Sequence, residues 1–142
     1  MARKQLMISM SDLPYHLGIK MRIYPSSQQK RIIAINCGVS RAVYNKLIAI
    51  NSELLHLRKT GIYIQTVAER IETLELRKKK LSKYYSYMSV NDVDSLAVAQ
   101  AKRNYNAAWN MFKKIHSSGV PKYHKKGVSD SYQTSCTYTT EN

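Results

Sequence analysis

The chain has 142 residues and a formal charge of +14 at neutral pH, from 23 Lys and Arg against 9 Asp and Glu. This length fits one domain, and a hydrophobic content of 44% can supply its core. No apolar run reaches the ~18 residues that a membrane-spanning helix needs. Residues 1–18 lack the apolar stretch and cleavage site of a secretory signal, and we expect them to form a poorly ordered extension. These features exclude a membrane span and favour a cytoplasmic protein.

The two cysteines, Cys37 and Cys136, lie far apart in the sequence, and neither belongs to a Cys-x-x-Cys pair. The four histidines show no ligand spacing with cysteines or acids. We therefore predict no metal site, no structural disulfide and no cofactor.

Residues 19–25 predict a first short strand, because polar and apolar side chains alternate until a proline ends the run. Ser26 or Ser27 can then cap a helix over about residues 28–35. Asn36-Cys37-Gly38 predicts the turn that ends this helix, since glycine tolerates the left-handed conformation of helix ends.

Ser40 can cap a second helix, whose apolar side chains recur at spacings of three and four, as on one buried face. The two helices and their glycine turn resemble a helix-turn-helix, a motif that any helical hairpin imitates. In such a pair Arg41, Asn45 and Lys46 lie off the buried face and can reach phosphates or bases. The buried face consists of Val43, Leu47, Ile50, Leu54 and Leu57.

A third helix follows the break at Thr60-Gly61, with an apolar stripe that runs from Ile64 towards Leu81. The basic run over residues 77–80 follows three glutamates, and we expect it to be a solvated helix face. Nearby tyrosines can stack on bases or pack at the rim of the core, and both readings stay open. They are Tyr84, Tyr85 and Tyr87.

Asn91 or Asp92 can cap a fourth helix that extends to about His116. Its expected core residues, with Trp109 as a packing anchor, are Leu96, Ala101, Tyr105, Ala108, Trp109, Phe112 and Ile115. The chain beyond Gly119 changes character, because residues 131–138 are rich in Thr, Ser and Tyr and look extended. We predict a mainly α fold: a helical bundle over residues 26–116, flanked by short strands, with a mobile end.

The positive charge is concentrated in two windows that contain no carboxylate. The first lies between Asp12 and Glu53, and the second between Asp94 and Asp130. Each phosphate that a lysine or arginine neutralises releases condensed counterions, so clustered and uncompensated cations favour a nucleic-acid partner.

Both windows contain motifs of a known transposon family. In the first, Arg22, Ile23, Tyr24 and Pro25, the pair Gln28 and Gln29, and then Gly38, Arg41, Val43, Tyr44 and Asn45 match its opening. In the second, the matching residues are Ala107, Phe112, Gly119, Pro121, Lys122, Tyr123, Lys125 and Lys126. From residue 19 to about 135, the chain resembles the N-terminal part of OrfB/TnpB-type transposon proteins, whose first region is labelled helix-turn-helix.

The resemblance implies that the chain is the N-terminal part of an RNA-guided DNA endonuclease or transposase, similar to compact type V CRISPR effectors. Residues 19–25 would be the first strand of a wedge-type barrel, and residues 26–116 a helical recognition lobe. Residues 117–142 would be a basic loop and an incomplete β segment that returns to the barrel. The family's RuvC-like carboxylates and its zinc ribbon would follow this chain, so we expect no catalytic residue and no enzyme activity here.

The resemblance and the charge pattern predict one set of contacts to DNA, RNA or both, without assigning either polymer to a residue. The candidate residues are Arg22, Lys30, Arg31, Arg41, Tyr44, Asn45, Lys46, Lys113, Lys114, Lys122, Tyr123, Lys125 and Lys126. The leading interpretation is a nucleic-acid-binding fragment, either a truncated frame or a retained binder. Two alternatives stay open: the first part of an intact nuclease, and a helical protein-interaction module without a nucleic-acid partner.

Overall fold

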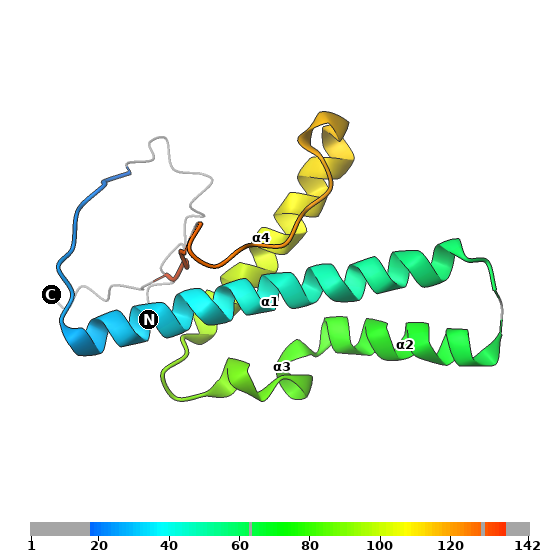
Figure 1. Cartoon of the computed structure of the whole chain (residues 1–142), viewed down its shortest axis with the longest axis horizontal. Coiled ribbons are helices and arrows are strands. Elements are labelled where there is room, and N and C mark those ends of the chain that lie inside the picture. The colour runs from blue at the N-terminus through cyan, green and yellow to red at the C-terminus, as the bar shows by residue number, and fades with distance from the viewer. Residues whose placement is uncertain (1–17, 63, 129, 136–142) are drawn as a thin grey trace, which may run out of the picture.

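The computed structural model describes residues 18–62, 64–128 and 130–135, and these form a helical structure (Figure 1). The three main helices are α1 (Ser27–Lys59), α2 (Gln65–Lys79) and α4 (Ser95–Lys114). Three short turns complete the elements: α3 (Leu81–Tyr84), η2 (Ser86–Ser89) and η3 (His116–Ser118). The prediction of a mainly helical bundle is confirmed. None of the described helices is long and apolar enough to cross a membrane.

Helix α1 begins at the predicted cap. Ser26 Oγ accepts a hydrogen bond from the Gln29 N–H at 3.3 Å, and the Ser26 N–H donates to Gln29 Oε1 at 2.8 Å. This reciprocal capping box satisfies donors that the first turn of a helix leaves free. At the other end the Thr60 N–H donates to the His56 carbonyl, and Gly61 takes a φ of +63°, a conformation that glycine adopts without strain.

The predicted turn at Asn36-Cys37-Gly38 is wrong, because α1 continues through it. Gly38 is helical, although glycine costs about 1 kcal/mol relative to alanine inside a helix. Packing offsets this cost, since Asn36, Cys37 and Ser40 are all buried. The Asn36 amide also donates to the Ile32 carbonyl at 3.0 Å, one helical turn back. The expected helix-turn-helix pair is therefore one helix of 33 residues.

Helix α2 runs antiparallel to the second half of α1 and forms a hairpin with it (Figure 1). Leu74 is the buried residue of the predicted stripe, and it packs with Ile50 and Leu54 of α1. Arg58 bonds to Glu75 across the pair, and the Arg70 guanidinium lies 2.7 Å from Glu53. The predicted stripe is not buried at the start of α2, where Ile64 is exposed.

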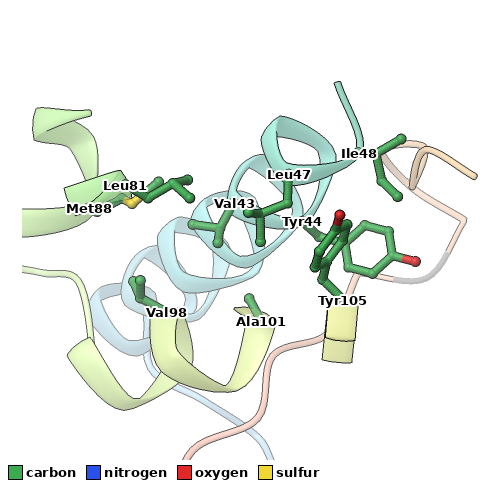
Figure 2. Close-up of a cluster of buried hydrophobic side chains, with 9 residues drawn as sticks. All are labelled: Val43, Tyr44, Leu47, Ile48, Leu81, Met88, Val98, Ala101 and Tyr105. Carbon is green, nitrogen blue, oxygen red and sulfur yellow. The ribbon is translucent and has the colours of Figure 1, made fainter. Parts of the chain in front are cut away.

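Helix α4 crosses the middle of α1 and closes the main core. Figure 2 shows Val43 and Leu47 of α1 between Leu81 and Met88 on one side and the small side chains of α4 on the other. The core residues of α4 are Ala97, Val98, Ala101 and Tyr105, with Ala108, Trp109 and Phe112 half-buried.

Two predicted core residues of α4 are wrong, because Leu96 and Ile115 are both exposed. The cap is also displaced: Asp94, not Asn91 or Asp92, accepts the hydrogen bond from the Leu96 N–H. The start of the helix sets its rotational phase, and the small residues Ala97 and Ala101 allow close approach to α1.

The predicted flanking strands are not found in the described residues. Residues 19–25 and 131–135 form no strand, and residues 19–25 are largely exposed. A strand needs a neighbour to satisfy its backbone groups, and no other described segment pairs with either one. The expected extension over residues 1–18, except Gly18, and the end of the β-prone segment lie outside the described residues.

Candidate nucleic-acid interface

The C-terminal segment, here residues 121–128 and 130–135, returns from the end of α4 to the first half of α1 (Figure 1). Asn45 holds it by the backbone: its amide donates to the His124 carbonyl at 3.0 Å and accepts from the His124 N–H at 2.8 Å. The His124 ring stacks on Tyr44 with centroids 4.0 Å apart and an angle of 11° between planes. One turn of α1 thus contacts both the backbone and the side chain of His124.

Further contacts attach the rest of this segment. Arg41 forms an ion pair with Asp130, whose second carboxylate oxygen accepts from the Gly127 N–H at 3.2 Å. Asn104 of α4 donates to Gln133 at 3.0 Å. The Thr134 hydroxyl donates a hydrogen bond to Asp94. This bond is the largest cause that lowers the pKa of the Asp94 carboxyl, and the bond from the Leu96 N–H is the next.

Three of the predicted contact residues therefore already bind other parts of the chain. Arg41 and Asn45 hold the C-terminal segment, and Tyr44 is buried between His124 and the edge of Tyr105. Burial raises the pKa of the Tyr44 hydroxyl. Their contact with nucleic acid stays a prediction, and it requires the C-terminal segment to leave or to share these side chains.

The other predicted residues are exposed, apart from Lys46. Lys46 is half-buried, with its ammonium 4.9 Å from the centre of the Tyr85 ring. Arg31 lies 3.6 Å from Asp92. The exposed set consists of Arg22, Lys30, Arg31, Lys113, Lys114, Lys122, Tyr123, Lys125 and Lys126.

Sequence reasoning missed a group of cations between the three main helices, which we name the basic hollow. It consists of two adjoining cavities of about 550 and 530 Å³. Their polar and aromatic lining includes Asn51, Arg58, Glu75, Lys78, Lys79, Lys102, Tyr105, Asn106, Trp109, Asn110 and Lys113. Of these residues, Lys113 was a predicted contact residue, Tyr105 and Trp109 were expected in the core, and Lys78 and Lys79 were expected on a solvated face.

The expectation of a solvated face over residues 77–80 is corrected at Arg77 and Lys78, which are half-buried. Lys78 donates to Asn51 at 2.9 Å and lies 5.6 Å from the centre of the Tyr105 ring. Burial is the main cause that lowers its pKa, and the nearby cations Arg58 and Lys113 lower it further. No single sequence window contains this cluster, because its cations come from three helices.

Cys37 is a buried free thiol, and burial raises its pKa. Among residues 18–62, 64–128 and 130–135, no three His, Cys, Asp or Glu side chains gather in a way that could hold a metal ion.

Residues 13–60 match the family model HTH_OrfB_IS605, described as a helix-turn-helix domain. Neither the curated proteins nor the solved structures gave a match to the chain. Within the matched range, residues 18–26 form no helix and the one described helix is α1, so the two helices that the family description names are not separated here. That description indicates DNA binding. Residues 13–60 thus resemble the helix-turn-helix region of the OrfB/IS605 family.

Proposed function

We propose that this chain is a nucleic-acid-binding part of a TnpB-like transposon protein, which holds target DNA, guide RNA or both without itself cleaving them. Catalysis would belong to a RuvC-like region of the same system. The family match supports the DNA component of this proposal, and the surface charge supports contact with either polymer.

The observation that carries the proposal is that the described lysines are not paired with carboxylates. Every ion pair between described residues contains an arginine. The pairs are Arg31–Asp92, Arg41–Asp130, Arg58–Glu75 and Arg70–Glu53. The lysines of the described part form no ion pair with a described carboxylate. Free ammonium groups on helices and on the C-terminal segment are what a phosphate backbone requires.

One dense group of such lysines lies on the C-terminal segment. Lys122, Lys125 and Lys126 are exposed, and they flank His124, whose backbone Asn45 fixes on α1. Anchoring of the segment reduces the entropy that its side chains lose when they bind a phosphate backbone.

The test compares binding of fluorescent duplex DNA and structured RNA at ~50 and ~200 mM salt. A Lys122→Ala, Lys125→Ala, Lys126→Ala variant is matched by a control with Lys59→Ala, Lys80→Ala and Lys83→Ala, three exposed lysines outside the candidate set. Loss of three phosphate contacts should reduce the slope of log K against log salt by about 2–3, since each contact contributes ~0.9 for duplex DNA.

The polymer with the tighter binding and steeper slope identifies the partner. Equal slopes for the two variants would remove the C-terminal lysines from the interface. Absence of binding to both polymers at low salt, by a protein with an intact helical spectrum, would refute the proposal and favour a protein-interaction module.

A further inference from the structure

The basic hollow is a wedge-shaped space between the α1–α2 hairpin and α4. Helix α1 contributes Asn51, Leu55 and Arg58, three positions on one face, because they are spaced by four and three residues. Helix α4 turns Lys102, Asn106, Trp109 and Lys113 toward the same space, at spacings of four, three and four. The first half of α4 packs on α1 through Val98, Ala101 and Tyr105, and its second half leaves α1 at an angle, which opens the hollow (Figure 1).

The hollow contains more cations than its acids can neutralise. Glu75 is the acidic residue in its lining, and this carboxylate already bonds to Arg58. Lys78, Lys79, Lys102 and Lys113 form no ion pair with a described carboxylate. A bound anion would relieve the repulsion that Arg58 and Lys113 exert on the half-buried Lys78 ammonium.

The lining also contains an aromatic ring and side-chain amides. Trp109 is half-buried and meets Tyr105 and Phe112 edge-to-face, with ring centroids 6.5 and 5.8 Å apart. These contacts fix the orientation of the indole beside the cations. Asn106 and Asn110, both exposed, add donors and acceptors that can bond to base edges.

We propose that the basic hollow binds a single-stranded nucleic-acid segment, with phosphates at Lys78, Lys102 and Lys113 and a base against Trp109. This inference rests on the proposed function and names one of its binding sites. Cations beside a stacking platform are the combination that single strands use, whereas the bases of a duplex are already stacked and not available to the indole. Cavities of about 550 and 530 Å³ lie in the range of pockets for small ligands, and so fit nucleotides instead of a whole duplex.

Trp109 is the one tryptophan of the 142 residues, so the intrinsic tryptophan fluorescence of the full chain reports on this hollow. We would titrate the protein with a short oligothymidylate at low salt and follow the quenching of that fluorescence. In parallel, anisotropy of labelled oligothymidylate and labelled duplex DNA would report binding anywhere on the surface. Stacking of a base on the indole should quench the emission with the same midpoint as the anisotropy of the single strand.

A variant of the basic hollow, the groove variant, carries Lys78→Gln, Lys102→Gln and Lys113→Gln. It should weaken the oligothymidylate affinity at least tenfold and abolish quenching. The matched control, Lys59→Gln with Lys80→Gln and Lys83→Gln, removes the same charge from exposed lysines outside the hollow and the C-terminal segment, and should keep the quenching midpoint within about threefold. Far-UV circular dichroism checks that both variants stay helical.

Unchanged affinity of the groove variant, or equal weakening of both variants, would overturn the assignment of the hollow and leave the proposed function standing. Anisotropy changes without quenching would place the single strand elsewhere and also overturn it. Failure of every polymer to bind the wild-type chain would overturn both proposals together.

Discussion

Asn36 connects the start of α4 to α1, and its replacement by alanine should destabilise the whole bundle. Its side chain is 2% exposed. The amide donates to the Asp92 carbonyl at 3.1 Å, and its oxygen accepts from the Asp94 N–H at 2.8 Å. These bonds join residues 56 and 58 positions apart, so they fix tertiary structure and not only the local helix.

The magnitude follows from the groups that the substitution leaves without a partner. A buried donor or acceptor that loses its hydrogen bond costs about 1–3 kcal/mol. The Asp92 carbonyl and the Asp94 N–H are only partly buried, so water recovers part of this cost, and the two together should cost about 2–3 kcal/mol. The higher helix propensity of alanine returns about 0.5 kcal/mol. We therefore expect Asn36→Ala to lower the free energy of unfolding by about 2 kcal/mol.

The assay is urea denaturation followed by far-UV circular dichroism. Ser52→Ala is the matched control, because Ser52 lies exposed on the same helix and its loss should change stability by less than about 0.5 kcal/mol. A second variant, Asn36→Asp, keeps the acceptor for the Asp94 N–H but places a carboxylate against the Ile32 and Asp92 carbonyls. It should be at least as unstable as the alanine variant. The reasoning is refuted by an Asn36→Ala protein whose stability equals that of Ser52→Ala.

Three further outcomes are expected. Ser26→Ala removes the cap of α1 and should cost about 1 kcal/mol, with faster amide exchange confined to the first turn; uniform exchange changes would contradict it. Asn45→Ala breaks both bonds to His124 and should speed tryptic cleavage within the C-terminal segment several-fold at unchanged helix content; an unaltered cleavage rate would mean that other contacts hold the segment. Burial raises the pKa of Tyr105 from 10.0 to about 12. As the pH rises, Tyr105 therefore ionises first in the unfolded chain, and the free energy of unfolding falls between about pH 10 and 12 by up to about 2–3 kcal/mol. Urea titrations at both ends of that range measure this loss, and Tyr105→Phe should reduce it.

The sequence predicted the helices where local chemistry decided them. The cap at Ser26 or Ser27 and the apolar stripe of the following helix are local signals. The cap forms at Ser26, and the stripe is buried at Val43, Leu47, Ile50 and Leu54, while Leu57 is half-buried. The break at Gly38 failed, because the buried Asn36 on the same helix finds partners in a loop more than fifty residues away. No local pattern contains that information.

The errors in α4 have a similar origin. Leu96 is more hydrophobic than Ala97, yet Ala97 is the buried one, since close contact with α1 selects small side chains at the crossing. The strand over Lys20–Tyr24 had the right alternation but no described neighbour to pair with. Alternation is necessary for a half-buried strand and does not supply its partner.

Only part of the candidate site could be predicted from the sequence. The acid-free windows singled out lysines such as Lys122 and Lys125, which lie exposed, and their contact with nucleic acid stays a prediction. These windows could not indicate that Lys78 and Lys113 lie near each other, because that proximity depends on the angle at which α4 leaves α1. The contacts of Arg41 and Asn45 with the C-terminal segment were equally invisible, since each joins residues from opposite ends of the chain.

The continuity of α1 has a mechanical consequence. A helix of 33 residues is a rod of about 50 Å, and no glycine turn divides it. The turn of α1 that holds His124 and the turn that lines the basic hollow with Arg58 therefore belong to one rigid body. Helix α4 crosses α1 near the middle of α1, and a ligand in the basic hollow would lie between α4 and the α1–α2 hairpin. The N-cap of α4 is Asp94, which accepts a hydrogen bond from Thr134, so this one helix joins the basic hollow to an attachment point of the C-terminal segment.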